Sequence, residues 1–355
     1  DIAAVVVYNE EYWYNRSQGS SRNDRLHPTL TEVNAALTDI QSTSGSSNEE
    51  GLRSYIGRFN YTGFNKYLFE ANFRVDGSSK FLPGSRFGFF PSAAVGWRFT
   101  EEKFIQKLTD KFLTSGKFRA SYGSLGNNSG VGRYEQQETL TNLNYVLGTA
   151  VQRGFANSKM INRFLSWETT TVLNLGLDLA FMRNRLTAAV DYYDRLTTGM
   201  NRPSEFSTFL SAAYSPAPRT NIGNLRNRGV EIDLSWKDRI GKLQYGFNLN
   251  GAFNTTNLEK WNQLLLRGNV FLEMPYQFVY AYQDNGIAQS WADIHKNTPQ
   301  GASPGDLLMK DLNGDGRITA DDRKAYSNLQ QERPTTTFSF NTYVAYKGFD
   351  FTLFP

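Results

Sequence analysis

Six stretches of the chain alternate strictly between apolar and polar or small residues. In the clearest, 173–181, four leucines and a phenylalanine interleave with Asn, Gly, Asp and Ala, and the pattern recurs at 186–193, 230–237 and 243–250. Side chains of a β-strand point to opposite faces with period two, so each stretch has one apolar and one hydrophilic face. The alternation predicts a wall of antiparallel strands with an apolar side and a water-facing side.

Two kinds of protein contain such strands. In a soluble sandwich the apolar face packs on a second sheet, whereas in an outer-membrane barrel it faces lipid and the polar face lines a lumen. The stretches run for about ten residues and carry Tyr, Phe and Trp toward their ends, which matches the span and the aromatic girdles of a membrane barrel. The strand pattern therefore favours the barrel over the sandwich.

The links between strands alternate between tight turns and long excursions. Tight turns fall near 63–65, 182–184, 238–241 and 347–348, and 100–115, with a short helix, occupies a short-turn position. Long loops cover 15–52, 77–85, 125–165, 196–225 and 255–335, with 41–48 as a flexible tip. Short periplasmic turns and long extracellular loops are typical of bacterial barrels. The eleven predicted strands cover 3–14, 53–62, 66–76, 86–99, 116–124, 166–181, 185–195, 226–237, 242–254, 336–347 and 349–354.

Closed bacterial barrels have an even number of strands, and an open edge in lipid leaves backbone groups unsatisfied. An odd count, an abrupt start at Asp1 and an end inside a strand predict that 1–355 is part of one larger barrel domain. We expect roughly half of the barrel wall to be present.

Composition narrows the function classes. With 20% charged residues, 14% aromatic residues and no long apolar run, the chain is not a helical membrane protein. The net charge of +4 comes from interspersed residues, so we do not expect nucleic-acid binding. His27 and His295 lack a ligand or nucleophile pattern, and the adjacent acids at 49–50, 101–102 and 321–322 are interpreted as solvated surface. The sequence predicts no enzyme.

One motif in the loop 255–335 predicts a calcium site. The segment 311–322 places oxygen-bearing side chains at positions 1, 3, 5 and 12 of an EF-hand-type loop, with glycine at position 6. Position 12 is Asp rather than Glu and no helix precedes the loop, so it is similar to a dockerin-type loop; the alternative is a polar turn that binds nothing. The predicted ligands of a structural calcium ion are Asp311, Asn313, Asp315, the carbonyl of Arg317, and Asp322.

Two further groups of residues lie on the hydrophilic strand faces or within the long loops. The charged residues of the hydrophilic faces either pair with each other or contact another molecule; they are Arg74, Asp76, Arg98, Lys117, Arg119, Asp178, Asp191, Glu231, Asp233 and Lys237. The loop aromatics either stack on sugar or peptide or pack the loop itself; they are Trp261, Tyr276, Tyr280, Tyr282 and Trp291.

An ordered set of phrases resembles one family, the SusC/RagA-type TonB-dependent transporters of Bacteroidetes. The phrases are SYIGRFNY at 54–61, FRVDGSS at 73–79, FPSAAVGWR at 90–98, RASYG at 119–123, WETT at 167–170, DYYDR at 191–195, NRGVE at 227–231 and the stretch 304–322. The resemblance implies an all-β, antiparallel transmembrane barrel of about 22 strands, here present in part, in the outer membrane. It implies an N-terminal plug domain and a TonB box, neither of which we find in this chain.

The same resemblance implies a function and partners. Family members import oligosaccharides or oligopeptides with energy relayed by TonB, and a SusD-like lipoprotein covers the barrel mouth as a lid. The alternatives are a surface adhesin that does not transport, the barrel of a larger outer-membrane assembly, and a soluble calcium-dependent carbohydrate-binding protein. The sequence leaves the choice between glycan and peptide open.

Overall fold

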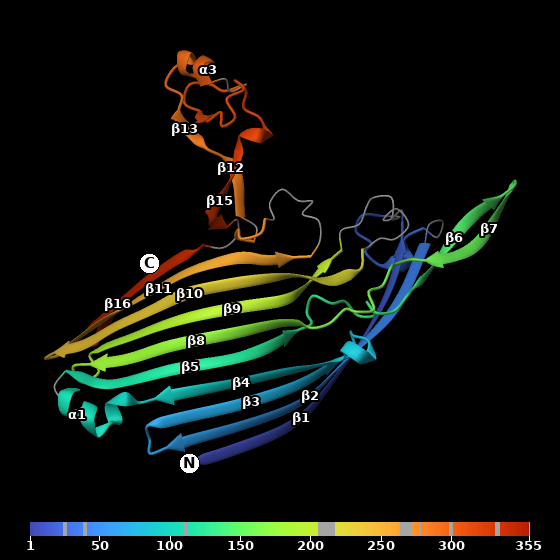
Figure 1. Ribbon diagram of the computed structural model, residues 1–355. Helices are drawn as coiled ribbons and strands as arrows, with labels where there is room; N and C mark the ends of the chain where they lie inside the picture. Colours follow the sequence, from blue (N-terminus) through green and yellow to red (C-terminus); the bar gives the residue numbers. More distant parts are fainter. Residues whose placement is uncertain are drawn as a thin grey trace.

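The computed structural model is dominated by one open, curved sheet of eleven strands (Figure 1). It describes residues 1–23, 27–37, 41–109, 112–204, 217–262, 271–276, 278–297, 301–330 and 334–354. Parts of three predicted long loops therefore lie outside the described residues, and the longest of these parts are 205–216 and 263–270. The sheet order is β1-β2-β3-β4-β5-β8-β9-β10-β11-β16-β17, and every neighbouring pair is antiparallel. The predicted all-β wall of eleven strands is confirmed.

The strand bounds match the predicted segments in order and differ mainly at the long-loop end. The strands are β1 (Ile2–Arg22), β2 (Gln41–Gly63), β3 (Tyr67–Ser78), β4 (Phe87–Trp97), β5 (Leu113–Asn127), β8 (Glu168–Phe181), β9 (Leu186–Pro203), β10 (Arg219–Ile240), β11 (Leu243–Trp261), β16 (Thr336–Tyr346) and β17 (Phe349–Leu353). Most of the predicted loop 15–52, including its expected flexible tip 41–48, is instead a ladder that runs to the pair Arg22 and Gln41. The side chains of this part of the ladder are polar on both faces. The sequence therefore shows no apolar–polar alternation there, although the backbones pair.

Smaller elements lie outside the main sheet. At the short-turn end, η3 (Phe99–Glu101) and α1 (Lys103–Thr109) join β4 to β5, as predicted for 100–115. At the long-loop end, β6 (Leu140–Leu147) and β7 (Ala150–Asn157) form a separate hairpin, and η1 (Val33–Ala35) and η2 (Pro83–Ser85) lie in other loops. Among the described residues, no helix is long and apolar enough to cross a membrane.

The predicted loop 255–335 has structure of its own, although β11 extends to Trp261 before the loop begins. It projects away from the main sheet (Figure 1) and contains a small core of Ala288, Ile294 and Leu308. Its elements are β12 (Phe278–Tyr282) paired with β15 (Arg323–Gln330), β13 (Asp284–Ile287) paired with β14 (Leu307–Met309), α3 (Trp291–Asn297) and η4 (Ala320–Asp322).

The two faces of the main sheet differ in chemistry as the alternation predicts. Register places Leu177, Val190 and Ile232 side by side on one face, and this face continues across the sheet as exposed apolar side chains. Large side chains that are more than a third exposed include Tyr55, Phe59, Phe69, Phe73, Val95, Trp97, Phe118, Leu175, Tyr192, Leu249, Phe253, Phe340 and Val344. An apolar surface of this extent would be unstable in water, so this outer face is the one that contacts lipid.

Candidate functional site

The opposite, inner face of the sheet carries paired charges. The Arg119 guanidinium forms two hydrogen bonds of 2.8 Å with Asp178 and also contacts Asp191 at 3.0 Å. These residues come from three adjacent strands, β5, β8 and β9, whose register sets them on the same side. A Cβ at Gly176 would lie 2.5 Å from a carboxylate oxygen of Asp191, so a larger residue there would displace the side chains of this cluster.

Other predicted inner residues have separate partners. Arg74 binds Asp76 at 2.6 Å and reaches Ser54, and Asp233 accepts a hydrogen bond from Asn248. The prediction that the charges pair with each other is confirmed for Arg119, Asp178, Asp191, Arg74 and Asp76. Arg98 instead donates to the backbone and side-chain oxygens of Asn65.

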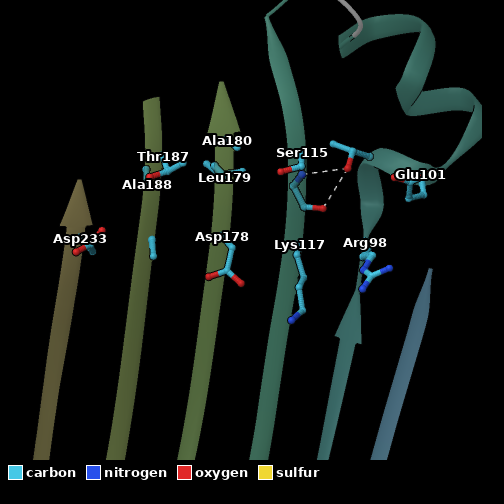
Figure 2. Close-up of a pocket in the computed structure, with 13 residues that line it drawn as sticks. Arg98, Glu101, Ser115, Lys117, Asp178, Leu179, Ala180, Thr187, Ala188 and Asp233 are labelled. Atoms are coloured by element: carbon cyan, nitrogen blue, oxygen red, sulfur yellow. Dashed lines mark hydrogen bonds between the residues drawn. The ribbon is translucent and has the colours of Figure 1, made fainter. Parts of the chain in front are cut away.

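The inner face is hollowed near its short-turn end. A hollow of about 370 Å³ is lined in part by Arg98, which follows β4, and by Lys117 of β5, Asp178 of β8 and Asp233 of β10 (Figure 2). Thr100, buried beside it, fixes η3 to β5 by accepting from Gly116 N at 3.0 Å and donating to Gly116 O. The carboxylates Asp178 and Asp233 lie on one side of the hollow, and the cations Lys117 and Arg98 lie on the other (Figure 2).

At the long-loop end, separate loops pack into a rim. Phe81 from the β3–β4 link is 1% exposed and packs with Val131, Leu165 and Trp167 from the two sides of the β6–β7 hairpin. The Phe81 and Trp167 rings are 5.2 Å apart, and the Trp167 indole donates to Arg86 O at 3.0 Å. No periodic pattern in the sequence predicts this rim core, because its members come from irregular segments.

Ion pairs on the rim correct one prediction. Glu50, interpreted as solvated surface, binds both Lys80 and Arg133 at 3.0 Å and has only 16% of its side chain exposed. Glu102 also has partners, since it accepts from Lys66 and Tyr67. Asp322 is fully buried. The solvated interpretation is wrong for these three: residues distant in sequence bind Glu50 and Glu102, and backbone groups of its own loop bind Asp322.

The aromatic residues of the projecting loop are divided between packing and exposure. Tyr280 and Tyr282 flank the guanidinium of Arg323 at 5.5 and 5.9 Å from their ring centroids, so both contribute to the loop itself. Tyr276 lies under Arg202 of β9 at 5.9 Å. Trp291 on α3 is 60% exposed and is available to a partner.

The predicted calcium-loop residues form a tight chain of turns. The Asp311 carboxylate accepts from Gly314 N at 2.6 Å and Gly316 N at 2.8 Å. Asn313 Oδ1 accepts from Asp315 N, and Asp315 Oδ1 accepts from Arg317 N at 2.8 Å. Gly314 and Gly316 have φ of +75° and +78°, a conformation that favours glycine.

Asp322 closes this loop from beneath. Its carboxylate accepts from the backbone N–H groups of Thr319 at 2.7 Å, Leu312 at 2.9 Å and Asn313 at 3.4 Å. These bonds, first that of Thr319, hold the pKa of the Asp322 carboxyl below its ordinary value. The Asp311 carboxyl makes a smaller contribution in the same direction.

The donor set fits a hard cation in type and order, but it is not a purely acidic cluster. Within the described part of the chain, no three His, Asp or Glu side chains converge as a ready-made metal centre. Of the five predicted ligands, Asn313 and the Arg317 carbonyl are neutral oxygen donors, which Ca²⁺ accepts alongside carboxylates. His27 and His295 are exposed, and neither belongs to such a cluster in the described residues.

The apolar outer face, the charged inner face and the sorting of short and long links together define an outer-membrane β-barrel protein. A family model described as TonB dependent receptor-like, beta-barrel matches residues 5–354. The chain therefore belongs to the TonB-dependent receptor β-barrel family, and it is of the SusC/RagA type. It is located in the outer membrane, and the family agrees with the expectation that the chain is not an enzyme.

Individual relatives support this assignment. TonB-dependent receptor P3 of Formosa agariphila is 31% identical over 332 residues, which cover 86% of this chain and 32% of that protein. TonB-dependent receptor SusC of Bacteroides thetaiotaomicron is 28% identical, over 98% of this chain and 35% of that protein. The chain thus spans about a third of the length of these relatives.

Solved structures show the same fold. The RagAB peptide transporter superimposes with a TM-score of 0.78 and 22% identity, over 99% of this chain and 38% of that one. The RagAB peptide importer in the open-open state gives a TM-score of 0.77. At this identity the likeness establishes the fold alone.

Proposed function

We propose that the protein containing this chain imports oligosaccharides or oligopeptides across the outer membrane, driven by TonB and assisted by a SusD-like lipoprotein lid. The observation that carries the proposal is a barrel wall of this family whose inner face presents paired charges and polar hollows along the route to the long-loop rim. A lumen lined by charges of both signs can contact hydrated, polar substrates without placing their polar groups against an apolar surface. TonB would act through a plug and TonB box, which belong to the rest of the protein.

Uptake measurements test this proposal. We expect cells expressing the intact protein and its lipoprotein to accumulate labelled glycan or peptide, and expect a protonophore or loss of TonB to abolish accumulation while surface binding persists. Mass spectrometry of ligands that co-purify with the intact complex would then distinguish glycan from peptide. Binding without any energy-dependent accumulation would instead favour the surface adhesin or assembly component.

The projecting loop is our candidate surface for the lid. It has its own core, so it can stand away from the wall, and it presents Trp291 on α3. Replacing 262–335 by a short flexible linker should leave the barrel heat-modifiable on gels, because β11 and β16 remain paired from Leu243 to Phe253. We expect the lipoprotein to be lost when this deletion variant is affinity-purified. Full retention of the lipoprotein would show that it contacts another loop.

We further propose that the loop 311–322 binds a structural calcium ion through Asp311, Asn313, Asp315, the Arg317 carbonyl and Asp322. The order of oxygen donors along the loop, with Asp311 at its first position and Asp322 at its twelfth, supports the proposal, because Ca²⁺ takes carboxylate and neutral oxygen ligands together. The ion would hold η4 against the segment that precedes it. Its role would be to stiffen the projecting loop rather than to regulate transport.

Removing two of these ligands is a direct test. Asp311→Ala with Asp315→Ala should eliminate bound calcium, measured by elemental analysis of the purified protein, and increase amide exchange across 301–330 without opening the barrel. Asp321→Ala is the matched control, since this exposed neighbour is not among the predicted ligands. Equal calcium content in the double variant and the control would contradict the proposed site.

A further inference from the structure

The tight turns of the barrel wall combine exposed apolar tips with cations. Phe64 is 85% exposed, Ile240 65% and Met182 41%; Ile240 ends β10, and Phe64 and Met182 directly follow β2 and β8. A Lys or Arg follows each of these residues within two positions. The cations of these turns and of the neighbouring strand ends are Lys66, Arg183, Arg185, Arg239, Lys242 and Lys347.

Carboxylates neutralise only part of this charge. Lys66 binds Glu102 at 3.0 Å and Arg185 binds Asp238 at 3.3 Å. The other cations have no carboxylate partner in the part of the chain that the structure describes. Arg239 donates to Gly241 O, Lys347 lies 5.3 Å from the centroid of the Tyr346 ring, and Arg183 and Lys242 are exposed.

The turns lie directly beside the aromatic margin of the lipid-facing surface. Tyr67 and Trp97 begin and end their strands at this margin, and both donate to Glu102, at 2.6 and 3.4 Å. The Tyr67 hydroxyl first, and then Lys66, hold the pKa of the Glu102 carboxyl below its ordinary value, so this group stays charged at the margin. Tyr and Trp prefer the level of the lipid headgroups, which places the neighbouring turn cations at phosphate depth.

At the opposite margin of the same face, three arginines are paired with carboxylates. There Arg53 binds Glu10 at 2.9 Å, and Arg228 binds Asp194 at 3.0 Å. Arg226 is held by both Asp194 at 2.7 Å and Glu259 at 3.0 Å. These three lipid-facing cations are therefore neutralised by carboxylates, whereas the four turn cations have no carboxylate partner among the described residues.

We propose that the short-turn end binds the headgroups of anionic phospholipids in the periplasmic leaflet of the outer membrane. The unpaired Arg183, Arg239, Lys242 and Lys347 contact lipid phosphate, while Phe64, Met182 and Ile240 sit among the glycerol and upper acyl groups. Cations that flank an apolar membrane surface attract anionic lipid in this way. The inference concerns the wall itself and does not depend on the transported substrate.

Lipid retention by the intact protein tests the proposal. The protein would be reconstituted in nanodiscs of phosphatidylcholine and phosphatidylglycerol, released gently, and examined by native mass spectrometry. Replacing Arg183, Arg239, Lys242 and Lys347 together by Gln should reduce retained phosphatidylglycerol by roughly fivefold or more and leave phosphatidylcholine unchanged. The matched control replaces four exposed cations of the long-loop end, Arg16, Arg153, Lys260 and Lys310, by Gln.

Equal loss of phosphatidylglycerol in both quadruple variants, or no loss in the turn variant, would overturn the proposal. If the turn variant does not fold, the unmodified protein still decides the question. Its preference for phosphatidylglycerol should weaken as salt rises from about 0.05 to about 0.5 M, since screening shortens the range of the attraction. The absence of any headgroup preference at the lower salt concentration would refute the proposal. This outcome would not affect the proposed transport function.

Discussion

Val190→Arg should destabilise the barrel by about 2–4 kcal/mol, while Ala189→Arg, one residue earlier, should change its stability by less than about 1 kcal/mol. Val190 is 42% exposed on the outer face, between Leu177 of β8 and Ile232 of β10. An arginine there would place its charge in the hydrocarbon of the bilayer.

Ala189 makes the adjacent substitution a matched control. It points to the inner face and is in register with Asp178 and Asp233, so an arginine there would have water and two carboxylates within reach. Denaturant unfolding of the intact protein in lipid vesicles, followed by gel mobility, measures both variants. Equal losses of stability for the two substitutions would show that the outer and inner faces do not contact lipid and water, respectively.

Phe81→Ala should open the long-loop rim, with a local cost of about 3–5 kcal/mol, because the deleted ring is almost fully buried. Phe81 contacts the side chains that join the β3–β4 link to the segments on both sides of the β6–β7 hairpin. We expect amide exchange to increase at 79–86, 128–139 and 158–167, while the strands of the wall keep their protection.

A second phenylalanine in the same region supplies the control. Phe164 is 88% exposed and lies beside Leu165 in the chain, so Phe164→Ala should change the exchange of these loops little. Hydrogen exchange read by mass spectrometry compares the two variants in the intact protein. Similar exchange in both would mean that the rim is held by its ion pairs, such as those of Glu50, rather than by its apolar core.

Local sequence correctly predicted the strands of the wall and the chemistry of their faces. Alternation identifies a strand and its apolar face without knowledge of its neighbours, as for 173–181 in β8. For β1 the same pattern predicted an end that is too early. The side chains beyond Tyr14 are polar on both faces and do not alternate, although the backbone ladder continues to Arg22. The sequence also marked 311–322 as a distinct loop, since its spacing of oxygen donors and glycines is local.

The contacts between distant segments were decided by the tertiary structure. Period two assigns Arg119 to the inner face, but register alone brings it to Asp178 and Asp191, 59 and 72 residues away. Likewise, Glu50 meets Arg133 only because the rim folds over it, and Asp322 is buried by backbone groups of its own loop. The sequence by itself determined which residues face lipid and which face water, because that depends on a strand's own repeat. Only the assembled sheet decided which residues are neighbours, because strand stagger and loop packing depend on every strand at once.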